Sequence, residues 1–482
     1  MGRICTPLRV GGAVLAIGLA LTIAAPSVAH AQTATTAAAA TTTATTTDTA
    51  TTAAPAAAEA APAAAPVAEA PKIDSGDTAW MLTSSLLVLM MTVPGLALFY
   101  AGMVRKKNIL ATLAQSFGAT CVITVAWMVV GYSIAFTANP NAQYNSFIGG
   151  LNYVLLAPMG LNSTTSLAPT IPESVYMFFQ MTFAIITPAL IAGALADRMK
   201  YSAFLLFMFF WLILVYCPIA HWVWGGGWLG SMGALDYAGG TVVHLNAGTA
   251  GLVAALMLGK RKGLGHADMA PYNLAYSVIG ASLLWVGWFG FNAGSAVTSN
   301  VNAGMAAAAT QIATAAAGLT WMIVEWILKG KPSVLGMISG AVAGLVAITP
   351  ASGFVDAEGA LIIGIGVGIV CFIAAVYVKK LFGYDDALDC WGVHGIGGAF
   401  GAIMTGLLAK NSINSLAHGA LFDGNWDQMR IQAIDVGGVF GYCLVVTFII
   451  LLVLKFTVGI RVSEAVEEEG LDVNLHGEVV QG

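Results

Sequence analysis

Two histidines, His244 and His394, lie within long apolar stretches of this 482-residue chain. His244 belongs to GGTVVHLNAG (239–248), and His394 belongs to WGVHGIGGA (391–399), 150 residues later. Ionisable side chains in such segments are costly and usually face a cavity or a partner. A neutral imidazole has one donor and one acceptor nitrogen, so two can share a hydrogen bond and still bind a small polar guest. One such histidine alone more often has a structural role, and it is the pair that favours a functional one.

A second set of candidate residues lies in HWVWGGGW (221–228) and in the loop that follows it. Trp224 comes directly before three glycines, where its face can bind a cation with about 0.5 to 2 kcal/mol. Trp222 and Trp228 are as readily interpreted as anchors at the membrane interface. Asp236, in a loop without other charges, either adds negative field at the mouth of a pore or caps the next helix.

Phenylalanines flank the expected path past the histidines. Phe179 and Phe183 lie in one apolar segment, and Phe291 lies in another, just before Asn292 and Ser295. Rings in such positions usually pack in a core. Phenylalanine can also form the hydrophobic constriction of a channel, and both interpretations stay open here.

Carboxylates are absent from the middle of every predicted span. A cation at the midplane without a counter-charge costs about 3 to more than 10 kcal/mol, whereas one cation–π contact returns at most about 2 kcal/mol. A guest that sheds its charge before the constriction avoids most of that cost. Ammonium can do so by giving up a proton, and a potassium ion cannot.

The composition is 58% hydrophobic and 9% charged, whereas about 25% of residues are charged in soluble domains. Apolar runs of the roughly 20 residues that cross a bilayer recur along most of the chain. These features predict an all-α polytopic membrane protein whose partner is the lipid bilayer, with no nucleic-acid partner and no enzyme activity. The six cysteines lack metal-finger or CxxC spacing, which predicts packing roles, no metal and no cofactor.

We expect eleven transmembrane helices, with five in each half of the chain and one extra helix at the end. Because five is odd, the halves cross the membrane in opposite directions, and this inverted repeat would bring both histidines together near the midplane of a pore through each subunit. No strong residue identity between the halves supports this step. The predicted spans are 79–103, 109–136, 173–196, 201–222, 240–259, 273–294, 302–328, 334–350, 359–378, 388–409 and 430–457.

The ends of the chain and the charged loops predict the location of the protein. Residues 1–31 are predicted to be a signal peptide with an A-x-A cleavage site, although an uncleaved first span is an alternative. Residues 32–78, rich in Ala, Thr and Pro, are predicted to be a disordered extracytoplasmic segment. The membrane domain would cover 79–458, and 459–482 would form a C-terminal tail. Lys and Arg cluster in alternate loops, which predicts a cytoplasmic tail and an extracytoplasmic N-terminus in a bacterial inner (plasma) membrane.

Several long motifs, in order, resemble the ammonium transporter (Amt/Mep/Rh) family, bacterial Amt branch, over roughly 79–478. The motifs are PGLALFYAGMVRKKN (94–108), IAGALADRMKYSA (191–203), HWVWGGG (221–227), GALDYAGGTVVHLNAGTAGLV (233–253), GWFGFNAGS (287–295), KPSVLGMISGAVAGLVAITPASG (331–353), DDALDCWGVHGIGG (385–398) and GIRVSEAVEEEGLDVNLHGE (459–478).

The resemblance implies a homotrimer for nitrogen uptake in which each subunit has its own pore. It implies an external ammonium site at Trp224, Phe183 and Ser295, supported by Asp236 without direct contact. It further implies a gate of stacked rings at Phe183 and Phe291, followed by His244 and His394 as twin histidines of the pore. The tail would couple subunits, and a cytoplasmic trimeric PII-type nitrogen-signal protein would dock on that side.

Two other function classes remain open on the sequence. An ammonium sensor would use the tail for signalling, although sensors of this family more often carry an added output domain. A membrane haem protein would use the two histidines as axial ligands. The leading hypothesis is a channel-like transporter that binds ammonium, removes a proton and conducts ammonia past the histidines.

Overall fold

The computed structural model describes residues 72–481, which form helices joined by loops, with no named strand in that range. The predicted signal peptide (1–31) and most of the predicted disordered segment (32–78) lie outside the described residues. The first helix begins at Ser75 rather than at residue 79, because the side chain of Asp74 accepts a hydrogen bond from the N–H of Asp77 and caps it.

Each of the eleven predicted spans is found as a helical segment, and several are interrupted by π-helical turns. The segments of the first half are α2 (Ser75–Met90) with η1 (Met91–Leu96) and α3 (Ala97–Met103), α4 (Ile109–Ala126) with η3 (Trp127–Gly131) and α5 (Tyr132–Phe136), α7 (Glu173–Leu195), α8 (Tyr201–Trp211) with η5 (Leu212–Tyr216) and α9 (Cys217–Val223), and η6 (Gly240–Leu245) with α11 (Asn246–Leu258).

The segments of the second half are α12 (Leu274–Gly294), α13 (Val301–Lys329), α14 (Val334–Ile348), α15 (Ala357–Ile373) with η7 (Ala374–Val378) and α16 (Lys379–Phe382), and η8 (Trp391–Gly395) with α17 (Ile396–Leu408), followed by the extra helix α19 (Asp427–Thr457). Short helices in the connections and the tail are η2 (Lys106–Asn108), α6 (Ala142–Asn145), η4 (Val154–Leu156), α10 (Trp228–Met232), α18 (Ala420–Asp423), α20 (Glu464–Glu469) and η9 (Asp472–His476).

Ten of these segments in residues 72–481 are long and apolar enough to cross a membrane. The eleventh, α14, has only 15 residues and ends at Ile348, two residues before its predicted end. It packs against α12, α13, α15 and α17, so much of its surface is covered by protein. Large apolar side chains on the outward faces of other helices, such as Leu86 and Ile327, remain exposed, as expected for surfaces that meet lipid or a neighbouring subunit.

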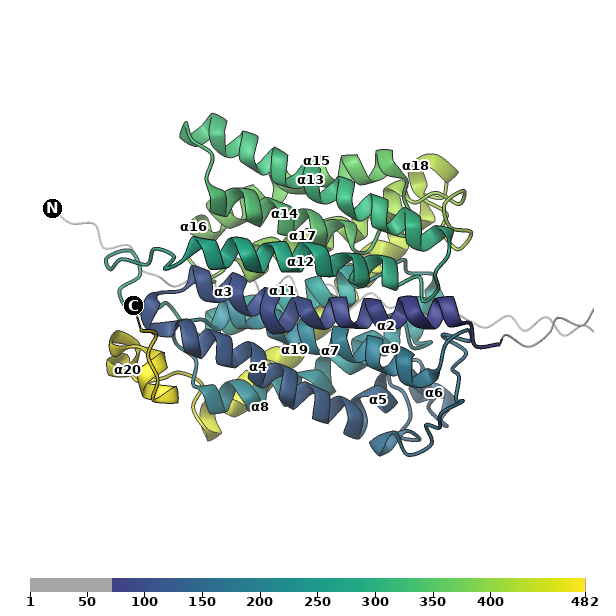
Figure 1. Ribbon diagram of the computed structural model, residues 1–482, viewed down its shortest axis with the longest axis horizontal. Helices are drawn as coiled ribbons and strands as arrows, with labels where there is room; N and C mark the ends of the chain where they lie inside the picture. The colour runs from purple at the N-terminus through teal and green to yellow at the C-terminus, as the bar shows by residue number, and fades with distance from the viewer. Residues whose placement is uncertain (1–71, 482) are drawn as a thin grey trace, which may run out of the picture. The chain divides into compact units, whose positions relative to one another are not determined.

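The contacts between helices follow the inverted repeat. In the first half α11 packs against α7, and in the second half the equivalent α17 packs against α14. Across the halves, α11 contacts η8 while α17 contacts η6, so each histidine-bearing segment lies against its counterpart. Figure 1 shows α2 running alongside α12, which are the first helices of the two halves and are in contact.

One end of the bundle carries the C-terminal residues 459–481, and we call it the tail face. Figure 1 shows α20 and the C-terminus at this end, where α16 also lies, while α6 and α18 lie at the opposite face. The carboxylate of Asp472 accepts hydrogen bonds from the N–H groups of Leu110 (3.0 Å) and Ala111 (2.8 Å) at the start of α4. The tail is therefore bound to the membrane domain.

Ion pairs at the tail face connect several basic loops. Arg105 pairs with Asp197 at 3.1 Å, and Arg261 pairs with the same Asp197 at 3.4 Å and with Asp385 at 2.9 Å. Burial opposes ionisation of Asp385, but the hydrogen bonds and charge of Arg261 outweigh it, so the pKa of Asp385 is lowered. The loops after the first and fifth spans thus meet at Asp197, which follows the third span, and the loop after the fifth span also meets the start of the tenth span.

Candidate functional site

His244 and His394 each lie in a π-helical turn that precedes a regular helix of 13 residues, namely η6 before α11 and η8 before α17. Turns of this kind are uncommon and often mark functional positions, because they shift side chains relative to a regular helix. Both imidazole side chains are buried. The structure brings them together, as the inverted repeat predicts.

The Nδ1 atoms of His244 and His394 are 3.3 Å apart, and the two rings lie 5.4 Å apart between centroids with an angle of 23°. If one Nδ1 donates, the other must accept, so the two neutral imidazoles have opposite tautomers. One Nε2 is then an acceptor and the other is a donor. The Nε2 of His244 is buried and has no hydrogen-bond partner among residues 72–481, so it can meet a small guest that both donates and accepts.

Two glycines, one helical turn after each histidine, permit this approach. A Cβ on Gly248 would lie 2.1 Å from the backbone nitrogen of Gly395. A Cβ on Gly398 would lie 2.5 Å from the carbonyl oxygen of Gly240. Both positions therefore exclude any side chain, and the two half-repeats cross where only glycine fits.

A repeated triplet of residues, which is not among the sequence-based predictions, underlies this arrangement. The first half has Asp236, His244 and Gly248, and the second half has Asp386, His394 and Gly398, each 150 positions after its counterpart. Asp386 accepts a hydrogen bond from the N–H of Trp391 at 2.7 Å, at the start of η8. The expectation that the halves share no strong residue identity is therefore incomplete, because the spacing Asp-x7-His-x3-Gly occurs in both.

Asp236 caps the start of η6, which agrees with one of its two predicted roles. Its Oδ1 accepts from the N–H groups of Gly239 (2.8 Å) and Gly240 (2.6 Å), and its Oδ2 accepts from those of Thr241 (2.9 Å) and Val242 (3.1 Å). Four backbone donors around one carboxyl group are the pattern of an ionised carboxylate at a helix N-terminus. The charge lies in the segment that carries His244.

An unbroken row of aromatic rings leads from Trp224 to the histidines. Trp224 meets the edge of Phe183 at 6.0 Å, and Phe183 is stacked on Phe291 at 4.1 Å with an angle of 18°. Phe291 lies 5.9 Å from His244. The two stacked rings lie between Trp224 and His244 in this row of contacts.

Neighbouring groups hold the ends of this row. Trp224 Nε1 donates to the backbone carbonyl of Asp236 at 2.8 Å, which fixes the indole beside the capped turn. Ser295 lies at the end of α12, where its hydroxyl donates to the carbonyl of Phe291 at 2.8 Å. That hydroxyl keeps its lone pairs as acceptors for another donor. Trp288, stacked on His244 at 5.2 Å, donates to Thr349 Oγ1 at 2.9 Å.

The other aromatic candidates pack around the row rather than within it. Phe179 lies 4.9 Å from Phe183 and supports it from the side. Trp222 is buried, donates to the carbonyl of Phe147 at 2.7 Å and meets Trp228 edge-on at 5.7 Å. Trp222 therefore packs within the protein.

His221 shows what a structural histidine looks like in this fold. Its Nδ1 lies 3.0 Å from the carbonyl oxygen of Ala135, and its Nε2 lies 2.7 Å from that of Asn145. Both ring nitrogens face backbone acceptors. No nitrogen of this side chain is left to meet a guest, in contrast to His244.

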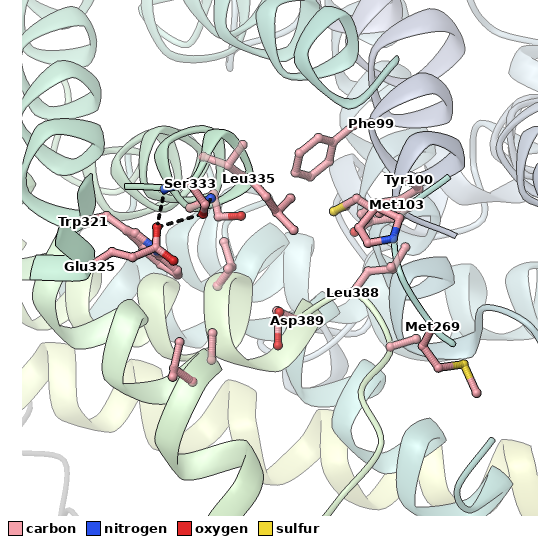
Figure 2. Close-up of a pocket in the computed structure, with 18 of the residues that line it drawn as sticks. Phe99, Tyr100, Met103, Met269, Trp321, Glu325, Ser333, Leu335, Leu388 and Asp389 are labelled. Atoms are coloured by element: carbon pink, nitrogen blue, oxygen red, sulfur yellow. Dashed lines mark hydrogen bonds between the residues drawn. The ribbon is translucent and has the colours of Figure 1, made fainter. Parts of the chain in front are cut away.

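A cavity of about 240 Å³ continues from His394 toward the tail face. Figure 2 shows Phe99, Tyr100 and Met103 on one side of it, with Trp321 and Glu325 across from them. Arg261 and Asp389 also line it, so its character changes from apolar to charged near the loops. Glu325 accepts hydrogen bonds from the hydroxyl (2.8 Å) and N–H (3.1 Å) groups of Ser333, drawn as dashed lines in Figure 2.

The geometry argues against axial ligation of a haem by the two histidines. Metal–nitrogen bonds are about 2 Å long, so two axial nitrogens lie about 4 Å apart with the porphyrin between them. The direct contact of the Nδ1 atoms at 3.3 Å leaves no room for that ring between these two nitrogens. Among residues 72–481, no group of three or more His, Cys, Asp or Glu side chains is placed to hold a metal ion.

Comparisons with known proteins agree with this architecture. A model described as the Ammonium Transporter Family matches residues 79–481. The chain belongs to the ammonium transporter family. It is 49% identical to an ammonium transporter of Bacillus subtilis (strain 168) over 403 residues, which cover 84% of this chain and 98% of the relative. It is 50% identical to an ammonium transporter of Aquifex aeolicus (strain VF5) over 413 residues, covering 85% and 94%.

Solved structures of this ammonium transporter family share the fold. The crystal structure of Saccharomyces cerevisiae Mep2 has a TM-score of 0.76 at 36% identity, covering 81% of this chain and 88% of Mep2. A structure titled Sensor Amt Protein has a TM-score of 0.75 at 28% identity, covering 83% and 98%. Family membership makes the chain a multi-pass membrane transporter of ammonium rather than an enzyme.

Proposed function

We propose that the chain is a channel-like transporter that binds ammonium at Trp224, where the ammonium gives up one proton to water on the external side, and conducts the resulting ammonia past His244 and His394. The observation that carries the proposal is the row of rings Trp224, Phe183, Phe291, His244 and His394, which ends in the cavity of about 240 Å³. A row of this kind defines one path between the two faces. All of its members except Trp224 are buried.

Recruitment takes place at the open end of the row. The face of Trp224 attracts a cation, and the lone pairs of the Ser295 hydroxyl accept from an ammonium N–H group. The carboxylate of Asp236, a residue whose backbone carbonyl accepts the hydrogen bond from the Trp224 indole, adds negative potential without touching the guest. Phe183 and Phe291 then exclude the hydrated cation, since their stacked rings offer no polar group.

Conduction uses the tautomer pair. Ammonia donates and accepts hydrogen bonds, so it matches one accepting and one donating Nε2 along the histidines. A bare potassium ion has no proton to lose and would enter this segment with its charge intact, at a cost of about 3 kcal/mol or more. The path therefore selects for a guest that can become neutral.

We further propose that the tail face is cytoplasmic in a bacterial inner membrane and that three copies assemble into a trimer for nitrogen uptake. The basic residues joined at the tail face support the orientation, and exposed apolar side chains support contacts with lipid or other subunits. The charged mouth of the cavity at Arg261 and Asp389 suits docking of a PII-type nitrogen-signal protein.

Uptake of labelled methylammonium into vesicles reconstituted with the purified protein tests the transport function. Simultaneous recording of current and internal pH after an ammonium pulse reports whether charge moves with the guest. Saturable uptake that ammonium competes with, and potassium does not, is expected. Potassium competition at equal concentration would contradict the selection described above.

An ammonium sensor is the second candidate, favoured by the likeness to the Sensor Amt Protein structure. In this case the tail bound at Asp472 would report occupancy of the pore. Methylammonium uptake, measured with the full chain and after truncation at residue 458, separates the two functions. A transporter retains methylammonium uptake without its tail, whereas a protein that only senses shows no uptake either with or without it.

A further inference from the structure

A buried carboxyl group, Asp435 of α19, lies directly behind the segment that Asp236 caps. The side chain of Asp435 is fully buried, and its Oδ1 lies 3.2 Å from the hydroxyl oxygen of Thr241. Its Oδ2 has no hydrogen-bond partner among the described residues 72–481. Thr241 lies in η6, three residues before His244, and α19 packs against η6. The extra helix outside the repeat thus reaches the external end of the path.

The hydroxyl of Thr241 connects two carboxyl groups but has only one proton. It donates to Asp236 Oδ2 at 2.8 Å, and that carboxylate already accepts four backbone N–H groups. The donors around Asp236 place the negative charge there. The contact between Thr241 and Asp435 is then a hydrogen bond only if Asp435 is the donor. An ionised Asp435 would have one weak contact and a bare, buried oxygen.

We propose that Asp435 holds a proton and, through the Thr241 hydroxyl, keeps Asp236 as the single negative charge behind the ammonium site at Trp224. Asp435 is a positioning residue, because it acts on the guest only through Asp236. It orders the Thr241 hydroxyl toward Asp236 and avoids a second charge that would hold ammonium too tightly for release. The inference deepens the proposed transport function and rests on it for its transport readout.

Infrared spectroscopy tests the protonation directly and does not depend on transport. The wild type minus Asp435→Asn difference spectrum at neutral pH should contain the carbonyl band of a protonated carboxylic acid. Asp356→Asn is the matched control, because Asp356 pairs with Lys410 at 2.5 Å and should give a carboxylate band instead. A difference spectrum for Asp435→Asn with only carboxylate bands would overturn the proposal.

Methylammonium kinetics test the positioning role. Asn keeps a neutral donor at position 435, so Asp435→Asn should have a KM within about twofold of wild type, whereas Asp435→Leu should raise KM several-fold with little change in kcat. The positioning role would be contradicted if Asp435→Leu had the same KM as wild type. It would also be contradicted if the KM of Asp435→Asn were as high as that of Asp435→Leu. If Asp435→Leu fails to fold, the KM of Asp435→Asn and the infrared band still test the proposal. Absence of uptake by wild type would refute the transport function and leave the infrared result standing.

Discussion

The Nδ1 atoms of His244 and His394 lie 3.3 Å apart, at a hydrogen-bonding distance that joins residues 150 positions apart in the chain. Each histidine belongs to a different half of the inverted repeat, so this hydrogen-bonding contact is also one of the contacts between the halves. Neither imidazole has a charged partner at this point of the path. The pair therefore acts through hydrogen bonds of neutral rings.

Removal of one imidazole should abolish conduction. We expect His394→Ala to lower methylammonium uptake at least tenfold, because the guest loses one of its two hydrogen-bonding partners in a buried segment. His418→Ala, at an exposed loop histidine, is the control and should transport normally. The thermal stability of both variants in detergent should stay near that of wild type. Full uptake by a folded His394→Ala protein would refute the twin-histidine path.

The indole of Trp224 should determine selection at the entrance. Trp224→Leu removes a cation–π contact worth about 0.5 to 2 kcal/mol, which corresponds to a loss of about 2- to 30-fold in apparent ammonium affinity. Inhibition of methylammonium uptake by added ammonium, compared with inhibition by added potassium, measures this loss of affinity. Trp228→Leu is the matched control, since the ring of Trp228 packs on Trp222 and not on a ring of the row. An unchanged competition profile for Trp224→Leu would exclude a cation site there.

The crossing of the halves should not tolerate a methyl group. Gly398→Ala places a Cβ 2.5 Å from the Gly240 carbonyl oxygen and 2.7 Å from the Leu245 nitrogen, so we expect a loss of about 1 to 3 kcal/mol or more and a displaced His244. Uptake and thermal unfolding should both fall. Gly437→Ala in α19 meets nothing within 4 Å and should gain about 0.5 to 1 kcal/mol. Equal uptake and equal thermal stability of Gly398→Ala and Gly437→Ala would contradict the close crossing of the two halves.

Asp386, the acid of the repeated triplet in the second half of the chain, should make the stability of the protein depend on pH. Burial raises the pKa of Asp386 to about 6, and the charge of Asp389 adds to this effect. Since the unfolded value is about 3.9, folding favours the protonated acid, and stability falls as pH rises from about 4 to about 6. We expect Asp386→Asn to be more stable than wild type at pH 8, by at most about 3 kcal/mol, and equal to it near pH 4. Thermal unfolding at both pH values measures this.

Glu478→Gln, at an exposed position of the tail, is the control for that experiment and should show no pH-dependent gain. A difference between Asp386→Asn and wild type that is the same at both pH values would show that Asp386 does not titrate in this window. A gain confined to low pH would reverse the sign and contradict the burial of a protonated acid.

Much of the fold and of the site could be predicted from the sequence, because hydropathy determines the spans and the odd number of spans per half determines the inverted repeat. The ring residues Phe183, Phe291 and Trp224 could be named through the family resemblance, and the structure places them in one row. The ends of helices were less predictable. Asp74 extends the first helix to Ser75 through a cap that hydropathy does not register.

The residues that were missed depend on contacts far apart in the chain. Gly248 and Gly398 look like ordinary packing glycines until the halves cross, although their equal spacing from the histidines was a visible signal. Asp435 was missed because it lies near the start of the last helix and meets Thr241, 194 positions away, only in the folded protein. Periodicity and motif spacing carry no information about such a contact.

The repeated triplet has a consequence for direction. A molecule that enters from either face meets the same order of groups, a capped turn, an imidazole and then the other imidazole, because the two halves are related by a rotation in the membrane plane. On the proposed path, the histidine pair is therefore equally passable both ways and cannot rectify flow. Any difference between entry from the two faces must come from what differs at the two ends, the aromatic rings at one and the charged cavity at the other.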